Sequence, residues 1–338
     1  MDLRILWFVL IAVLYIGYFV LEGFDFGVGM LHPFMSKNDT KRRMVINTIG
    51  PHWDGNEVWL ITAGGATFAA FPHWYATLFS GFYLPLFILL IGLILRGVAL
   101  EFRSKDENRV WRSFWDWAIS IGSFLPALLW GVALANFLRG VPIDANMHYV
   151  GGFWNLLNPF ALLAGVVSVL AFLIHGAVFL SIKLSGEMVR KARRIASRLW
   201  LPLVILFAGL IVFNAYETDG LSQAGILPIV IAVLSWVALV FAGWWIKKSR
   251  DGMAFGMTSL SIFLAIASVF IQLFPRVLIS SLAPEWSLTI FNAASGDTTL
   301  KAMTTVVLFA LPIILAYQAW SYWIFRKRIS QNPMELEY

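Results

Sequence analysis

The sequence contains no cysteine and few charged residues. The absence of cysteine from all 338 residues excludes disulfide bonds, thiolate metal ligands and a thiol nucleophile. Only 13% of the residues are charged, whereas 59% are hydrophobic and the mean hydropathy is +0.77. Soluble proteins carry about 25% charged residues. The composition therefore predicts an integral membrane protein.

The motifs of several enzyme classes are also missing. There is no glycine-rich phosphate loop, no His-Glu-x-x-His motif and no Ser/His/Asp set in a suitable context, which argues against hydrolases and nucleotide-binding proteins. The net charge of +6 comes from short basic clusters between apolar runs. Such clusters indicate membrane topology, and we expect no nucleic-acid partner.

Nine apolar runs could cross a bilayer, whose hydrocarbon core takes ~20 helical residues. We therefore expect an all-α integral membrane protein with transmembrane helices at residues 5–31, 53–71, 74–99, 113–137, 159–182, 199–216, 225–246, 255–274 and 302–325. The second run is the least apolar because Asp54 and Glu57 shorten it. The alternation of basic segments along the chain nevertheless favours nine crossings.

Lysine and arginine mark the cytoplasmic side of membrane proteins. Most of the 25 such residues lie in the C-terminal tail and in the connections after the first, third, fifth and seventh runs. We expect these segments on the cytoplasmic side, with the N-terminus outside and the C-terminus in the cytoplasm.

Several carboxylates fall inside or beside the first two runs. A charge in hydrocarbon costs at least about 2.5 kcal/mol, so each needs a partner or a water-filled cavity. Glu22 and Asp25 are three residues apart and share one face of the first helix. Asp54 and Glu57 lie near the start of the second helix, where the helix dipole favours negative charge. At 1.5 Å per residue, Asp25 lies about 28 Å from Leu6, near the cytoplasmic boundary.

Two interpretations fit these residues. Asp25 and Asp54 could be stations of a proton pathway, or the buried carboxylates could simply form ion pairs with Arg96 in the third helix. Arg96 and Glu101 are five residues apart, roughly 140° around a helix, so we do not expect them to pair with each other. Glu57, Arg96 and Glu101 are therefore candidates for structural ion pairs.

His175 lies within the fifth apolar run. An intramembrane imidazole can be a haem ligand, a proton relay or a hydrogen bond between helices. No second axial His or Met stands out at a matching depth, which favours the hydrogen bond. We expect no metal or cofactor to be held by ligands of this chain.

Several stretches together resemble subunit II of the cytochrome bd quinol oxidases. They are Glu22-Gly23-Phe24-Asp25-Phe26-Gly27-Val28-Gly29-Met30, Arg42-Arg43, Ile46-Asn47, Gly50-Pro51-His52-Trp53-Asp54-Gly55-Asn56-Glu57-Val58-Trp59, Phe68-Ala69-Ala70-Phe71-Pro72, Arg96-Gly97-Val98, Trp115-Asp116-Trp117, Asn158-Pro159-Phe160, Phe274-Pro275 and Trp320-Ser321-Tyr322-Trp323. The resemblance covers essentially the whole chain.

The resemblance implies a fold of two four-helix bundles and one extra helix, divided here as residues 1–147, 148–280 and 281–338. It also implies a bacterial cytoplasmic-membrane complex in which a haem-bearing subunit I, with haems b and d, oxidises quinol and reduces dioxygen to water. This chain would be the haem-free partner. Small single-helix accessory subunits and a bound quinone or lipid belong to the same expectation, with no pocket assigned. By motif, Asp25 and Asp54 would line a proton route toward subunit I, with Glu22 beside them.

Two other classes of function compete with this interpretation. A proton-coupled secondary transporter also buries carboxylates and breaks helices with Gly and Pro, although it does so near the midplane. A structural scaffold that only stabilises a haem-bearing partner fits the sequence as well. Association with a haem-bearing subunit would separate the oxidase from the transporter.

Overall fold

The computed structural model describes residues 2–329 and 336, and this part of the chain is almost entirely helical. The helices are α1 (Leu3–Met35), α2 (Asp39–Ile49), α3 (Trp53–Ala70), α4 (Pro72–Gly81), α5 (Tyr83–Phe102), α6 (Arg109–Arg139), α7 (Pro159–Lys183), α8 (Glu187–Glu217), α9 (Gly220–Ala224), α10 (Leu227–Lys247), α11 (Asp251–Leu273) and α12 (Asp297–Ile324). Two short strands, β1 (Arg276–Leu278) and β2 (Leu288–Thr289), pair antiparallel.

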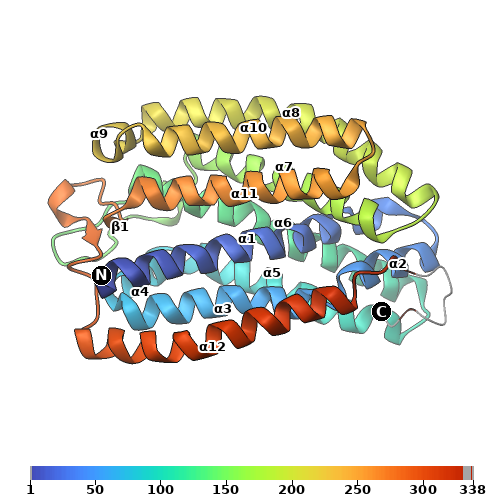
Figure 1. The fold of residues 1–338 in the computed structure, drawn as a ribbon, viewed down its shortest axis with the longest axis horizontal. Helices are drawn as coiled ribbons and strands as arrows, with labels where there is room; N and C mark the ends of the chain where they lie inside the picture. Colours follow the sequence, from blue (N-terminus) through green and yellow to red (C-terminus); the bar gives the residue numbers. More distant parts are fainter. Residues whose placement is uncertain (1, 330–335, 337–338) are drawn as a thin grey trace.

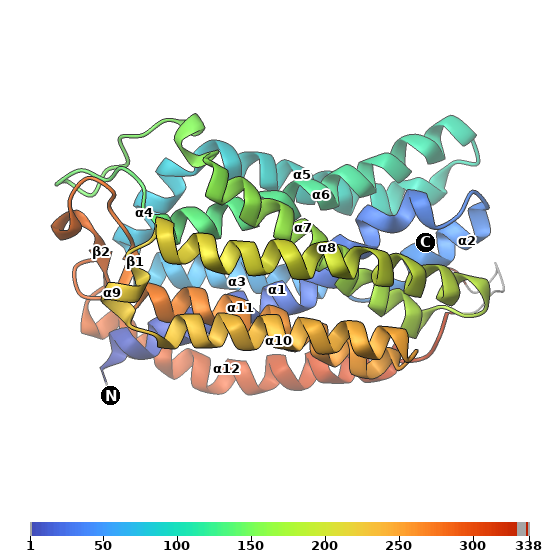
Figure 2. The ribbon, with the colours of Figure 1, turned by 90° about the horizontal axis from the view of Figure 1, so that it is seen from above.

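The long helices run side by side along the longest axis of the molecule (Figures 1 and 2). The strands, α4 and α9 lie at one end, called here the ribbon end. The helix α2 and the C-terminal end of α12 lie at the other, the α2 end. Within the described residues, eight helices are long and apolar enough to cross a membrane: α1, α5, α6, α7, α8, α10, α11 and α12. The prediction of an all-α integral membrane protein is confirmed.

The helix α3 corresponds to the second predicted crossing. It runs alongside α1 and packs against it (Figure 1). Asp54 and Glu57 make it less apolar than the other eight, so composition alone does not identify it as a crossing. The count of nine therefore remains a prediction, supported by the position of α3.

The helix boundaries differ from the expected runs in three places. The run 74–99 is not one helix, because the chain breaks at Phe82 between α4 and α5. Pro85 explains the break, since its ring clashes with the carbonyl of the residue four positions earlier, Gly81. The charged helix α2 was not expected at all. Finally, α8 begins at Glu187, twelve residues before its apolar part, and so carries a basic first half.

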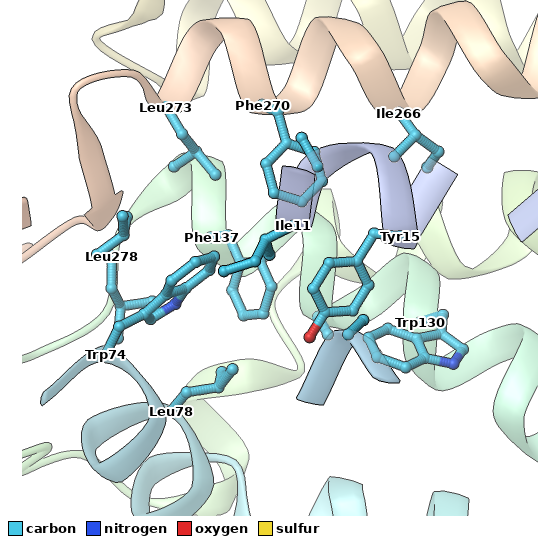
Figure 3. Packing of buried hydrophobic residues seen from close by; sticks show 14 of the residues in the cluster. Ile11, Tyr15, Trp74, Leu78, Trp130, Phe137, Ile266, Phe270, Leu273 and Leu278 are labelled. Carbon is cyan, nitrogen blue, oxygen red and sulfur yellow. The ribbon is translucent and has the colours of Figure 1, made fainter. Parts of the chain in front are cut away.

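The first helix is the centre of the fold and packs against α3, α6, α7 and α11. In its half toward the ribbon end, Ile11 and Tyr15 contact a cluster that includes Trp130 and Phe270 (Figure 3). These rings and aliphatic chains fill the space between α1, α6 and α11. The first helix thereby joins the early and late parts of the chain.

Toward the middle of the molecule, α1 and α7 approach so closely that only glycine fits. A Cβ atom on Gly27 would lie 1.9 Å from the carbonyl oxygen of Phe172, and one on Gly176 would lie 2.5 Å from the carbonyl carbon of Gly27. Both clashes are with backbone atoms, which cannot rotate away. Small residues at such positions let membrane helices pack backbone against backbone.

We predict that Gly27→Ala destabilises the protein by about 1–3 kcal/mol, because the added methyl group forces α1 and α7 apart. The measurement is thermal unfolding of the purified protein in detergent. Gly209→Ala in α8 is the matched control, since a Cβ there meets nothing within 4 Å. Equal unfolding temperatures for the two variants would contradict the prediction.

Candidate functional site

Three charged side chains from three helices meet inside the protein. Arg96 of α5 pairs through Nη2 with Oε1 of Glu22 in α1 and with Oε1 of Glu57 in α3. Arg96 and Glu22 are fully buried, whereas Glu57 is partly exposed. The guanidinium also lies 4.9 Å from the ring centre of Phe26, which adds a cation–π contact. The ion pairs of Arg96 are thus with Glu22 and Glu57, and no ion pair in the described residues joins it to Asp25 or Asp54.

Asp25 lies one turn further along α1 and is also fully buried. Its Oδ2 accepts a hydrogen bond of 2.7 Å from Nδ2 of Asn56 in α3. The α1 helix continues ten residues beyond Asp25, about 15 Å, so this carboxylate lies well before the end of the helix. Asp25, Glu22, Glu57 and Arg96 give three carboxylates to one guanidinium. A site with this composition can bind protons.

Asn56 connects Asp25 to the last helix. Its Oδ1 accepts hydrogen bonds from the Tyr322 hydroxyl, at 2.8 Å, and from Nε2 of Gln318, at 3.1 Å. Sequence analysis missed all three of these residues. The available signal was the position of Asn56 between Asp54 and Glu57 at the start of a membrane helix, together with the polar residues near the end of the ninth apolar run.

The structure places Asp54 and Glu101 apart from this cluster. Asp54 is exposed on the outer surface of α3, and no hydrogen bond joins it to Asp25 in the described part of the chain. Glu101 is exposed near the end of α5. Arg96, five residues earlier, pairs with Glu22 and Glu57.

His175 of α7 links three helices. Its Nδ1 lies 2.8 Å from Oγ1 of Thr258 in α11, and its Nε2 lies 3.1 Å from the carbonyl oxygen of Val20 in α1. The ring stacks on Phe255 at 4.7 Å. Both ring nitrogens are therefore engaged, as expected for a hydrogen bond between helices. Across residues 2–329, His, Asp and Glu form no group of three suited to a metal ion.

A second buried charge cluster, at the α2 end, was not expected. Asp116 of α6 contacts Nε2 of His32, Nη1 of Arg42 and Nε of Arg103, each at 2.5 Å. Arg103 also reaches Asp39 at 2.8 Å. Sequence analysis noted Asp116 only within a motif, because its partners are spread over 70 residues of chain. These contacts tie α1, α2 and α6 together.

An apolar cavity of about 170 Å³ lies between α6, α7, α8, α10 and α11. Most of its lining is aliphatic or aromatic, for example Leu134, Phe207 and Ile262. Asn214 and Gln272, which hydrogen bond to each other at 3.0 Å, add a polar edge. The cavity therefore suits the tail of an apolar molecule with a small polar group.

His52 lies at the junction of α2 and α3, outside the long helices. It is buried and stacks on Tyr322 at 4.4 Å, with the two rings nearly parallel. Burial, together with the positive charge of Lys183, lowers the pKa of His52 to about 4. The imidazole therefore stays neutral in the folded protein at physiological pH.

We predict that the protein loses stability as the pH falls below about 6.5, where the unfolded chain protonates His52 and the folded chain does not. By pH 5 the loss amounts to about 2 kcal/mol. The measurement is the unfolding temperature in detergent between pH 7.5 and pH 5. His52→Phe keeps the stacked ring, cannot titrate and should flatten this part of the profile; an unchanged profile would contradict the assignment.

The fold and the buried site define a helical membrane protein whose polar interior lacks an evident metal or haem ligand set in its described residues. The family model for cytochrome bd terminal oxidase subunit II matches residues 3–325, and the chain belongs to this family. It is thus a subunit of a respiratory oxidoreductase. The resemblance stated from the sequence is confirmed.

Individual relatives agree over nearly the full length. Cytochrome bd ubiquinol oxidase subunit 2 of Bacillus subtilis (strain 168) is 44% identical over 334 residues, covering 98% of this chain and 99% of that protein. Cytochrome bd-I ubiquinol oxidase subunit 2 of Escherichia coli (strain K12) is 40% identical, with coverage of 98% and 97%. A chain in the structure of bd oxidase from Geobacillus thermodenitrificans has a TM-score of 0.79 at 20% identity, covering 96% of this chain and 99% of that chain, and so shares the fold.

Proposed function

We propose that this chain is the haem-free subunit of a quinol-oxidising, dioxygen-reducing complex. The observation that carries the proposal is the near full-length similarity to proteins named ubiquinol oxidase subunit 2. In this proposal haems b and d belong to subunit I, and His175 serves as a hydrogen bond between helices, with both ring nitrogens engaged. The secondary transporter is not favoured by these relatives. The Asp25→Asn and Asp54→Asn variants described below test whether the role of this chain is purely structural.

The chain contributes a proton path from the cytoplasmic side through Asp25, Asp54 and Glu22. Asp25 and Glu22 are buried in the core, whereas Asp54 is exposed on α3. An exposed carboxylate on a membrane helix is costly unless it faces a protein partner or water. This cost supports a position for Asp54 at the contact with subunit I, with the two buried acids behind it.

The contact with subunit I includes one face of α3. Asp54, Val58, Ile61, Gly65 and Phe68 are exposed and recur at helical spacing, so they form a single stripe along the helix. A Cβ on Gly65 would meet nothing within 4 Å in this chain. Small residues on an open membrane face allow close approach of another helix. The open stripe supports a partner helix at this position.

Topology and bound molecules complete the proposal. The basic connections at the α2 end face the cytoplasm of a bacterial cell, so the N-terminus lies outside.

The chain divides into two four-helix bundles, residues 1–147 and 148–280, followed by segment 281–338 with α12. The central position of α1 ties the two bundles together. The 170 Å³ cavity takes the expected quinone or lipid. Small accessory subunits use other lipid-facing helices.

We predict that Asp25→Asn and Asp54→Asn each slow quinol-dependent oxygen uptake by about tenfold or more, because each removes a proton-binding group from the path. The haem spectrum of the purified complex should be unchanged. Glu285→Gln, in the connection at the ribbon end, is the control for loss of a carboxylate. Normal oxygen and proton uptake in both variants would refute the path. Loss of the haem subunit from the preparation would instead support a structural role.

We predict that Gly65→Leu prevents subunit I from co-purifying, since the larger side chain blocks a partner helix while meeting nothing in this chain. The readout is the ratio of haem to this chain after mild detergent extraction. Gly209→Leu, on the opposite part of the molecule in α8, should retain a normal ratio. Retention of subunit I by Gly65→Leu would show that the contact lies elsewhere.

A further inference from the structure

The last helix is weakly packed yet makes specific polar contacts. Leu300 is its only buried side chain within Asp297–Ile324. Near its C-terminal end, however, Gln318 and Tyr322 are one turn apart and both reach Oδ1 of Asn56. Two hydrogen bonds from one exposed helix to one buried amide call for an explanation beyond packing.

The chemistry of these groups permits two arrangements of the link between Asp25 and α12. In the observed one, Tyr322 and Gln318 donate to Oδ1 of Asn56, and Nδ2 of Asn56 donates to Oδ2 of Asp25 and, at the longer distance of 3.4 Å, to the carbonyl oxygen of Leu21, a bond that the second arrangement gives up. The N–H donor that Asn56 directs at Oδ2 suits an ionised Asp25, because an ionised carboxylate can only accept hydrogen bonds. If the Asn56 amide turns over, its oxygen faces Asp25 and its NH₂ group faces α12. That second arrangement matches a protonated Asp25, whose O–H donates to the amide oxygen.

Both residues on α12 can serve either arrangement. A tyrosine hydroxyl donates and accepts, and a glutamine side chain presents both an NH₂ group and an oxygen. A lysine or an aspartate in their place would support only one amide orientation. The other oxygen of Asp25, Oδ1, has no protein hydrogen-bond partner, so a proton placed there would find no acceptor in the described chain. A proton on Oδ2 has an acceptor, the Asn56 amide oxygen, once the amide has turned.

We propose that Asn56, Tyr322 and Gln318 form a reversible hydrogen-bond switch that positions Asp25 for gaining and losing its proton. This inference rests on the proposed proton path through Asp25. In the step itself, a proton from cytoplasmic water binds Oδ2 of Asp25, and the Asn56 amide turns so that its oxygen accepts a hydrogen bond from the new O–H, while the proton stays on Asp25. Release to the next group on the path reverses the turn. The helix α12 thereby acts as a positioning element for this carboxylate.

The test uses the intact complex with subunit I. Tyr322→Phe combined with Gln318→Met removes both acceptors from α12, so a turned Asn56 would leave a buried NH₂ group unpaired, which proteins tolerate less readily than an unpaired carbonyl. The switch should stay in its observed arrangement. We expect quinol-dependent oxygen uptake to fall about tenfold, the effect of one buried hydrogen bond, with haem content unchanged. Tyr317→Phe, an exposed hydroxyl on the same helix, should behave as wild type.

An infrared difference spectrum of reduced against oxidised enzyme separates this inference from the proposed path. The band lost in Asp25→Asn identifies the protonated Asp25, and the double variant should lack it too. Normal turnover and a normal Asp25 band in the double variant would overturn the switch while leaving the path intact. Normal turnover in Asp25→Asn would overturn both. If the double variant fails to assemble, Tyr322→Phe alone should slow uptake a few-fold, and an unchanged rate and band there would also overturn the switch.

Discussion

The position of Arg96 sets the main constraint on this structure. A guanidinium fully buried among membrane helices needs anionic partners, and Glu22 and Glu57 supply them from two other helices. Breaking such a pair by removing one member costs about 3–5 kcal/mol, because the remaining charge is left uncompensated. The ion pairs therefore fix how α1, α3 and α5 sit against one another. Asp25 lies on α1 and Asn56 on α3, so the same ion pairs set the distance between these two side chains.

The two buried polar clusters differ in their balance of charge. At the α2 end, Asp116 contacts the guanidinium groups of Arg42 and Arg103 and the His32 ring, and Arg103 also pairs with Asp39. Around Arg96 the carboxylates are in excess. Carboxylates matched by arginines suit a structural tie between helices, whereas an excess of acids suits proton binding. This difference in composition separates the interior acid site from the cluster that holds the α2 end together.

The sequence allowed the helical membrane fold and the residue types of the site to be predicted, since both depend on local hydrophobicity and on the high cost of buried charge. Glu22, Asp25 and Arg96 stood out for that reason. The break at Phe82 and the amphipathic helix α2 did not follow from apolar runs. Neither did the pairing of Asn56 with Tyr322, because 266 residues separate these side chains. Which helices meet depends on tertiary packing that a single sequence does not reveal.

The position of α12 in the chain determines when the site is completed during synthesis. This helix leaves the ribosome after α1 and α3, and it supplies the two groups that complete the hydrogen bonds of Asn56. Until α12 inserts, the nascent chain contains the acids of the site but not the groups that orient the amide beside Asp25. The site is therefore completed only after α12 has been made. A chain cut short before α12 would carry buried acids without their full set of hydrogen-bond partners.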